Sequence, residues 1–112
     1  MTVDEGTELD LICTDLGTHT RRDLATLRHE GGRWVQVNYR RNAAGYTYGS
    51  DYKQGQLRQR ADGGLIYTPP PCPSCRKALD AGIRDDTLTR YVEATRDTPL
   101  AGSMDVSLAI RR

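Results

Sequence analysis

Residues 72–75 read Cys72-Pro73-Ser74-Cys75, and this short segment decides the fold that the sequence predicts. A C-x-x-C turn brings two thiolates to one point, and so supplies half of the four ligands that a tetrahedral zinc ion requires. The other half is predicted in the turn after the first strand, where five residues separate Cys13 from His19. This separation exceeds the usual spacing of about two to four residues, but Gly17 allows the backbone to curl back.

The 52 residues between His19 and Cys72 form a long chain segment whose two ends a metal ion would hold together. The entropic cost of closing a loop grows only logarithmically with its length, so this long segment adds little to the free-energy cost of forming the site. A structural zinc ion is worth about 10–16 kcal/mol of apparent binding free energy in small peptides, enough to decide whether a small domain folds. The sequence therefore predicts structural Zn²⁺, although a sulfur-rich tetrahedron also accepts iron. The predicted ligands are Cys13, His19, Cys72 and Cys75.

The composition favours a domain that needs more than hydrophobic burial to fold. The chain has 112 residues, which predicts a single domain over residues 1–112. Only 37% of the residues are hydrophobic and none is Phe, which is lean for a small core. The odd number of cysteines, three, is typical of a reducing compartment, so we expect a cytoplasmic protein. No apolar run is long enough to span a membrane, and no secretory signal is expected.

Alternating apolar and polar residues predict four strands, over residues 8–13, 23–29, 33–40 and 65–68. Residues 1–7 are predicted to be a frayed terminus. Residues 41–64 contain five of the eleven glycines and no lasting period, and are predicted to be a long loop.

The pair Gly31-Gly32 predicts a hairpin between the second and third strands. A three-residue loop over residues 30–32 places Val35 opposite Leu27. A two-residue turn over residues 31–32 places the same valine opposite Arg28. Because the first option pairs apolar with apolar, we expect the three-residue loop.

One helix is predicted to start near Asp85 or Asp86, both good caps, and to end by Thr98, because Pro99 disfavours helical geometry before it. The alternation from Met104 onward predicts a final strand over residues 104–110. The predicted fold class is thus α+β, a small antiparallel β-sheet domain with one C-terminal helix and a final strand.

Four segments carry a resemblance to a known family. They are the run Ile12-Cys13-Thr14-Asp15-Leu16-Gly17-Thr18-His19 followed by Arg21 and Arg22, the motif Cys72-Pro73-Ser74-Cys75, the polar helix over residues 86–94, and the tail over residues 104–108. With these segments the chain resembles small zinc-ribbon-like, rubredoxin-like proteins of actinobacteria and their phages, which mostly lack an assigned function. The resemblance implies a zinc-ribbon-like fold and a metal site built from Cys13, His19, Cys72 and Cys75, and it implies no activity. One departure concerns Arg76, because this family usually has Gly after the second cysteine. The turn should therefore relax, or Arg76 should carry backbone strain.

His29, the other histidine, is the rival fourth ligand, but we expect it to be exposed near the hairpin turn. C-P-S-C also resembles the active-site motif of glutaredoxin-like enzymes, which would make Cys72 and Cys75 a thiol–disulfide pair. In those enzymes a helix starts directly after the motif and lowers the thiol pKa. Here the nearest predicted helix starts about ten residues later, and no βαβ pattern precedes the motif. We expect no enzymatic activity.

A protein-interaction or adaptor module is the favoured function, because Tyr and Arg are enriched at interfaces. If the chain is phage-encoded, as the resemblance permits, its partner would be a host protein. The final strand could also pair with its own copy and form a homodimer. No membrane association is expected.

Nucleic-acid binding is the alternative function. Residues 1–15 carry five acids and no base, whereas residues 16–60 carry nine bases and three acids. Aromatic and cationic side chains alternate in this basic segment, as in proteins that stack bases and neutralise phosphates. The candidate binding residues are Trp34, Tyr39, Arg40, Arg41, Tyr46, Tyr48 and Tyr52.

Overall fold

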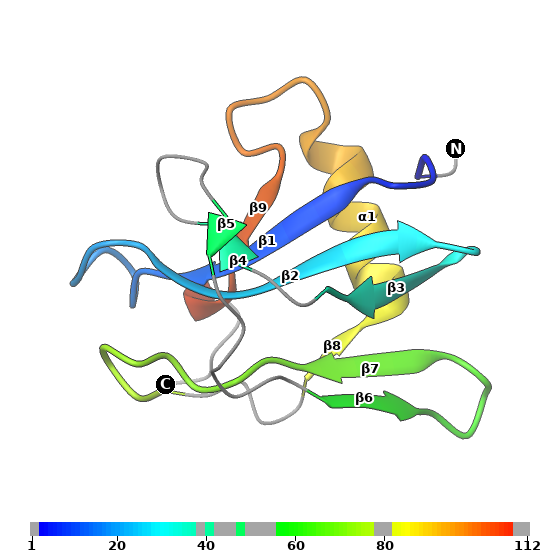
Figure 1. Cartoon of the computed structure of the whole chain (residues 1–112), viewed down its shortest axis with the longest axis horizontal. Coiled ribbons are helices and arrows are strands. Elements are labelled where there is room, and N and C mark those ends of the chain that lie inside the picture. The colour runs from blue at the N-terminus through cyan, green and yellow to red at the C-terminus, as the bar shows by residue number, and fades with distance from the viewer. Residues whose placement is uncertain (1–2, 38–39, 42–46, 49–55, 78–81, 109–112) are drawn as a thin grey trace.

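The computed structural model describes residues 3–37, 40–41, 47–48, 56–77 and 82–108, and Figure 1 shows their arrangement. The strands are β1 (Glu8–Cys13), β2 (Arg22–Glu30), β3 (Arg33–Gln36), β4 (Arg40–Arg41), β5 (Thr47–Tyr48), β6 (Gln56–Gln59), β7 (Leu65–Thr68), β8 (Ile83–Arg84) and β9 (Ser103–Asp105). The helices are α1 (Asp85–Thr95) and a 3₁₀ helix (Val106–Leu108). The fold is therefore α+β, as predicted.

Within the described residues the strands form three small sheets. The largest has the order β3-β2-β1-β9 and is mixed, because β9 runs parallel to β1 while the other pairs are antiparallel. The second is the pair β4-β5, and the third is the antiparallel sheet β6-β7-β8. The prediction of a purely antiparallel domain is wrong at β9.

The core lies between the four-stranded sheet, α1 and the β6-β7-β8 sheet (Figure 1). The Trp34 indole N–H on β3 donates to the Thr89 hydroxyl on α1 (3.1 Å). The Tyr67 hydroxyl on β7 donates to the side-chain carbonyl of Gln36. The largest fully buried side chains are Trp34, Tyr67, Leu9, Leu11, Leu24, Leu27 and Leu88.

The predicted hairpin exists, but the predicted register is wrong. Arg28 lies opposite Val35, and only Gly31 and Gly32 form the turn. Both glycines have positive φ, 61° and 80°, as a two-residue type I′ turn requires. Apolar matching could not select the register, because consecutive residues 23–27 of β2 are buried and both faces of the strand are therefore covered.

Residues 3–7 are ordered beside β2, so the prediction of a frayed terminus is wrong for them. The Gly6 amide donates to the His29 carbonyl, and the His29 amide donates to the Thr7 carbonyl, both at 2.8 Å. Val3 is buried in the core. Residues 1–2 lie outside the described part of the chain.

The predicted long loop is wrong for residues 56–59, which form β6 and pair with β7. Gln56-Leu57-Arg58-Gln59 contains a single apolar residue, so it showed no alternation by which a strand could be predicted. Short strands also form at residues 40–41 and 47–48. Residues 42–46 and 49–55 lie outside the described residues.

The C-terminal elements agree with the prediction in part. The helix is confirmed and ends before Pro99, but Asp85 and Asp86 lie in its first turn and Arg84 is the N-cap residue. The final strand is shorter than predicted, because the Ser107 amide donates to the Asp105 side chain (3.0 Å) and closes a turn directly after β9. Among the described residues no helix is long and apolar enough to cross a membrane.

Replacing Gly82 by Ala is expected to lower the free energy of unfolding by about 2–4 kcal/mol. Gly82 has φ of +76°, and an added Cβ would clash with Ile66 Cγ2 and lie 3.0 Å from the Tyr67 carbonyl oxygen. Backbone strain and overpacking both oppose the substitution. Gly63→Ala is the matched control, because Gly63 has φ of +89° and nothing within 4 Å; it should cost about 1 kcal/mol. Urea denaturation measures the free energy of unfolding of both variants, and an equal decrease for Gly82→Ala and Gly63→Ala would contradict the prediction.

Candidate metal centre

The first turn of the candidate metal centre, here called knuckle 1, covers residues 13–19 and follows directly from β1. The amides of Gly17 (3.0 Å) and His19 (3.1 Å) both donate to the Thr14 carbonyl. Asp15, Leu16 and Gly17 have φ of 49°, 56° and 92°. Three consecutive residues with positive φ reverse the chain within one short turn, so Gly17 does help the backbone to curl back as predicted.

Knuckle 2 covers residues 72–77 and follows β7 through the three prolines. The Arg76 amide donates to the Cys72 carbonyl (2.8 Å), and the Cys72 amide donates to the Lys77 carbonyl (3.1 Å). Arg76 has φ of 63°, the conformation that glycine adopts at lowest cost. Of the two expectations for this position, backbone strain at Arg76 is the one that the structure confirms.

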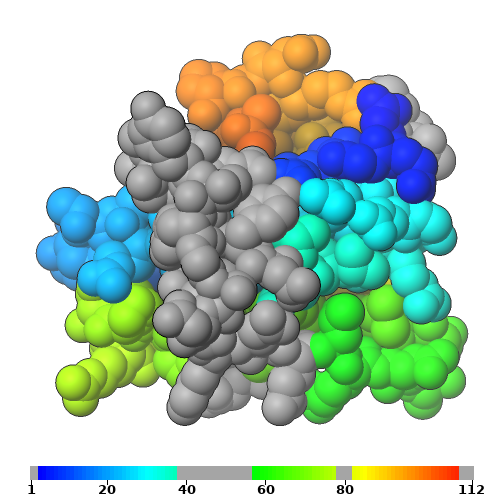
Figure 2. Space-filling model, in the orientation of Figure 1, coloured from blue at the N-terminus to red at the C-terminus, as the bar shows by residue number. Residues whose placement is uncertain are grey.

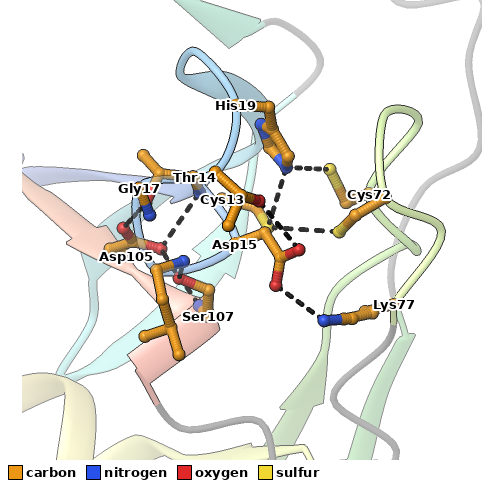
Figure 3. Close-up of polar contacts among 12 residues, drawn as sticks. Cys13, Thr14, Asp15, Gly17, His19, Cys72, Lys77, Asp105 and Ser107 are labelled. Atoms are coloured by element: carbon orange, nitrogen blue, oxygen red, sulfur yellow. Dashed lines mark hydrogen bonds and ion pairs between the residues drawn. The ribbon is translucent and has the colours of Figure 1, made fainter.

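The two knuckles bring one ligand atom from each of the four predicted residues within 4.8 Å of one another. Cys13 Sγ lies 3.8 Å from Cys75 Sγ, while His19 Nε2 lies 3.6 Å from Cys72 Sγ and 3.9 Å from Cys13 Sγ (Figure 3). A tetrahedral ion that binds sulfur at about 2.3 Å separates two sulfurs by about 3.8 Å. A disulfide would require about 2.05 Å, so the spacing is that of metal ligands.

The ring of His19 is oriented for metal binding by a backbone group. Its Nδ1 lies 2.7 Å from the Thr20 carbonyl oxygen, which can only accept, so Nδ1 carries the proton. In the neutral ring Nε2 is then the atom with a free lone pair, and it faces the sulfurs. The hydrogen bond to Thr20, with the thiol of Cys75, raises the pKa of His19.

The three thiols differ in their environment. Burial raises the pKa of Cys13 to about 12. Burial acts in the same direction on Cys75, but the Lys77 amide and the side chains of His19 and the other cysteines outweigh it, and the pKa of Cys75 falls to about 7. Cys13 and Cys72 are buried and Cys75 is half-buried, so the centre is closed on the core side.

Polar contacts outside the four ligands also join the knuckles. Lys77 Nζ of knuckle 2 lies 2.8 Å from an Asp15 carboxylate oxygen of knuckle 1. Just beyond knuckle 1, an N–H of Arg22 at the start of β2 donates to the Ser74 hydroxyl of knuckle 2 (3.1 Å). The segment with knuckle 1, in blue, therefore lies directly against the segment with knuckle 2, in yellow-green, at the left edge of the molecule (Figure 2).

The other candidate residues lie away from this centre or outside the described side chains. His29 is buried, not exposed as predicted, and packs edge-on against Trp34 with ring centroids 5.0 Å apart. Trp34 is 1% exposed, so its indole is not on the surface where a base could stack. Tyr39, Tyr46 and Tyr52 lie outside the described residues, and Arg40, Arg41 and Tyr48 are described as strand backbone only.

Sequence reasoning missed the residues of the C-terminal segment that contact knuckle 1. Asp105 accepts hydrogen bonds from the Thr14 amide (3.3 Å) and hydroxyl (2.6 Å). The Ser107 hydroxyl accepts one from the Leu16 amide (3.1 Å). The spacing Asp-x-Ser predicts a local turn, but no local pattern predicts a contact across 91 residues.

Comparison with protein-family models, with curated proteins and with solved structures finds no match. The resemblance to zinc-ribbon-like proteins therefore stays a prediction, and the centre is assessed on its own geometry.

Uptake of a divalent metal ion is expected to release protons, and the affinity should rise with pH. Cys13, with its pKa of about 12, is protonated at neutral pH and must lose that proton to bind. Because of this one proton, the metal affinity should fall about tenfold for each unit by which the pH is lowered. Calorimetric titration in two buffers of different ionisation enthalpy measures the released protons. An affinity that stays constant between about pH 6 and pH 8 would contradict the assignment of these thiols as ligands.

Proposed function

We propose that this chain is a structural zinc protein, in which one Zn²⁺ ion binds Cys13, His19, Cys72 and Cys75. The observation that carries the proposal is the convergence of these four donor atoms within 4.8 Å. Three thiolates and one imidazole form a common shell of structural zinc sites, whereas catalytic zinc keeps a position for water. With four protein ligands the ion has no open coordination position for water, so its role is to stabilise the fold.

The placement of the ligands supports a ribbon-like arrangement. Each knuckle lies beyond a strand of a different sheet, knuckle 1 after β1 and knuckle 2 after β7. A single ion would therefore join the four-stranded sheet to the β6-β7-β8 sheet. Iron suits a shell of four thiolates better than one containing imidazole, so the histidine favours zinc.

We further propose that the zinc-held end of the molecule is a protein-interaction surface. Leu16 is 55% exposed and Leu108 is 75% exposed, and the Leu16 amide bonds to Ser107, the residue before Leu108. An apolar groove of about 280 Å³ between α1 and β9 includes Leu108 and is lined also by Ile83 and Val106. Neighbouring exposed apolar residues at a groove are typical of protein contact sites.

Thiol–disulfide exchange through Cys72 and Cys75 has less support. Cys72 is 1% exposed, and α1 starts at Asp85, so its N-terminus is not placed to activate a thiol at residue 72 or 75. A half-buried Cys75 with a lowered pKa is also what a metal ligand requires.

The purified protein is expected to contain one zinc ion per chain by elemental analysis. Cys75→Ser should reduce the zinc content to below about one-tenth of an ion, because a serine hydroxyl does not replace a thiolate ligand. Ser74→Ala is the matched control, since it alters the same turn without removing a ligand, and it should keep its metal. Unmutated protein without any bound metal would overturn the proposal, and iron in place of zinc would correct the identity of the ion.

Replacing both Leu16 and Leu108 by Ser is expected to abolish retention of a protein partner while leaving the zinc content unchanged. The control is Leu100→Ser, which changes another exposed leucine (62%) and should retain the partner. The measurement is quantitative affinity capture with each variant. Salt-dependent retention on single-stranded DNA, lost in Arg40→Ala/Arg41→Ala, would instead favour nucleic acid.

A further inference from the structure

Asp105 and Ser107 form a support beside knuckle 1 (Figure 3). Asp105 Oδ2 accepts the Thr14 hydroxyl at 2.6 Å, and Asp105 Oδ1 accepts the Thr14 amide at 3.3 Å. Asp105 Oδ1 also accepts the amide (3.0 Å) and hydroxyl (2.7 Å) of Ser107. The Ser107 oxygen in turn accepts the Leu16 amide at 3.1 Å. The chain thus reaches the metal-binding turn a second time, from the far end of its sequence.

The network needs a carboxylate at residue 105. Four donors share the two Asp105 oxygens, and only an ionised carboxylate offers acceptors on both oxygens. Burial acts to raise the pKa of Asp105, but the hydrogen bonds from Ser107 and Thr14 outweigh it and lower the pKa below its usual value. Asn at this position keeps the shape and loses one acceptor.

Knuckle 1 is a turn that requires such support. Asp15 and Leu16 are not glycines, and their φ values of 49° and 56° each cost about 1–2 kcal/mol in backbone free energy. Conformations of this kind persist where the surrounding contacts over-determine them. The contacts from Asp105 and Ser107 are made to Thr14 and Leu16, between the two metal ligands of the turn.

We propose that Asp105 is a positioning residue for the metal centre, which holds knuckle 1 in the conformation that presents Cys13 and His19 to one ion. The inference rests on the proposed zinc site. It implies that metal binding and docking of residues 103–107 are coupled, and such coupling is reciprocal. Loss of the carboxylate weakens zinc binding, and zinc binding tightens the C-terminal segment on β1.

The test measures zinc affinity by competition with a chromophoric chelator. Asp105→Asn is expected to weaken zinc binding about 10–100-fold, the usual effect of removing a group that orients metal ligands. Asp86→Asn is the matched control, because Asp86 on α1 forms an exposed ion pair with Arg84 of β8, and its substitution removes the same charge as Asp105→Asn. The affinity of this control should stay within about twofold of the unmutated protein.

Two readouts separate positioning from general stabilisation. The cobalt-substituted Asp105→Asn protein should show an altered ligand-field spectrum, because Cys13 and His19 no longer meet the ion at the same angles. In the unmutated protein, zinc should slow hydrogen exchange of the Leu16 and Ser107 amides, and Asp105→Asn should abolish that slowing. A stabilising role unrelated to the ion would change neither.

Thr14 supplies a second, independent variant pair in case Asp105→Asn does not fold. Thr14→Val removes the hydroxyl that donates to Asp105 and that accepts the Gly17 amide (3.2 Å), while it keeps the branched side chain. It should weaken zinc binding about 10-fold. Thr14→Ser keeps the hydroxyl and should restore the affinity. In the double variant Thr14→Val/Asp105→Asn, the fold-loss of zinc affinity should be smaller than the product of the two single fold-losses. The reason is that both substitutions disrupt the same hydrogen bond between Thr14 and Asp105.

The outcomes distinguish this inference from the proposed zinc site. An unmutated protein that binds no metal overturns both. If the unmutated protein binds zinc while Asp105→Asn and Thr14→Val bind it within about twofold of the same affinity, the zinc site stands and the positioning role of Asp105 is wrong.

Discussion

The rest of this structure depends on the approach of two short turns, residues 13–19 and 72–77, that lie far apart in the sequence. Their four donor atoms fall within 4.8 Å of one another, and each turn continues from a strand of a different sheet. A domain with 37% hydrophobic residues and no Phe gains less from burial than most domains of its length. The proposed ion would link both turns and add to the core contacts that hold the two sheets together.

Both turns carry backbone strain, and the contacts that offset it come from other parts of the chain. Arg76 and Leu16 have φ of 63° and 56°. Knuckle 2 is tied to knuckle 1 by the ion pair between Lys77 and Asp15, and knuckle 1 is tied to the C-terminal segment by Asp105. The ligand arrangement therefore results from tertiary contacts as well as from the local sequence of the knuckles.

The sequence was sufficient to predict that Cys13, His19, Cys72 and Cys75 come together, and to predict the elements whose signals are local. Cys72 and Cys75 are set by a four-residue motif, and the alternation of β1 and the period of α1 extend over several residues. The hairpin register was wrong because both faces of β2 are buried, so the polarity of its residues does not identify one inward face. β6 was missed because its four residues include a single apolar one, so no alternation marks it as a strand. The contacts of Asp105 were missed because they join residues 91 positions apart, and no local sequence pattern records such a partner.

The same contacts connect the metal centre to the exposed leucines. Leu16 belongs to knuckle 1, and Leu108 directly follows the serine that accepts the Leu16 amide. Displacing residues 105–107 would therefore move both leucines relative to each other and relax the turn that carries Cys13 and His19. A partner that requires both leucines in one place would consequently bind the metal-loaded form more tightly than the metal-free form, since a ligand selects the state for which it has the higher affinity. The ion would then control the function of this surface without being part of it.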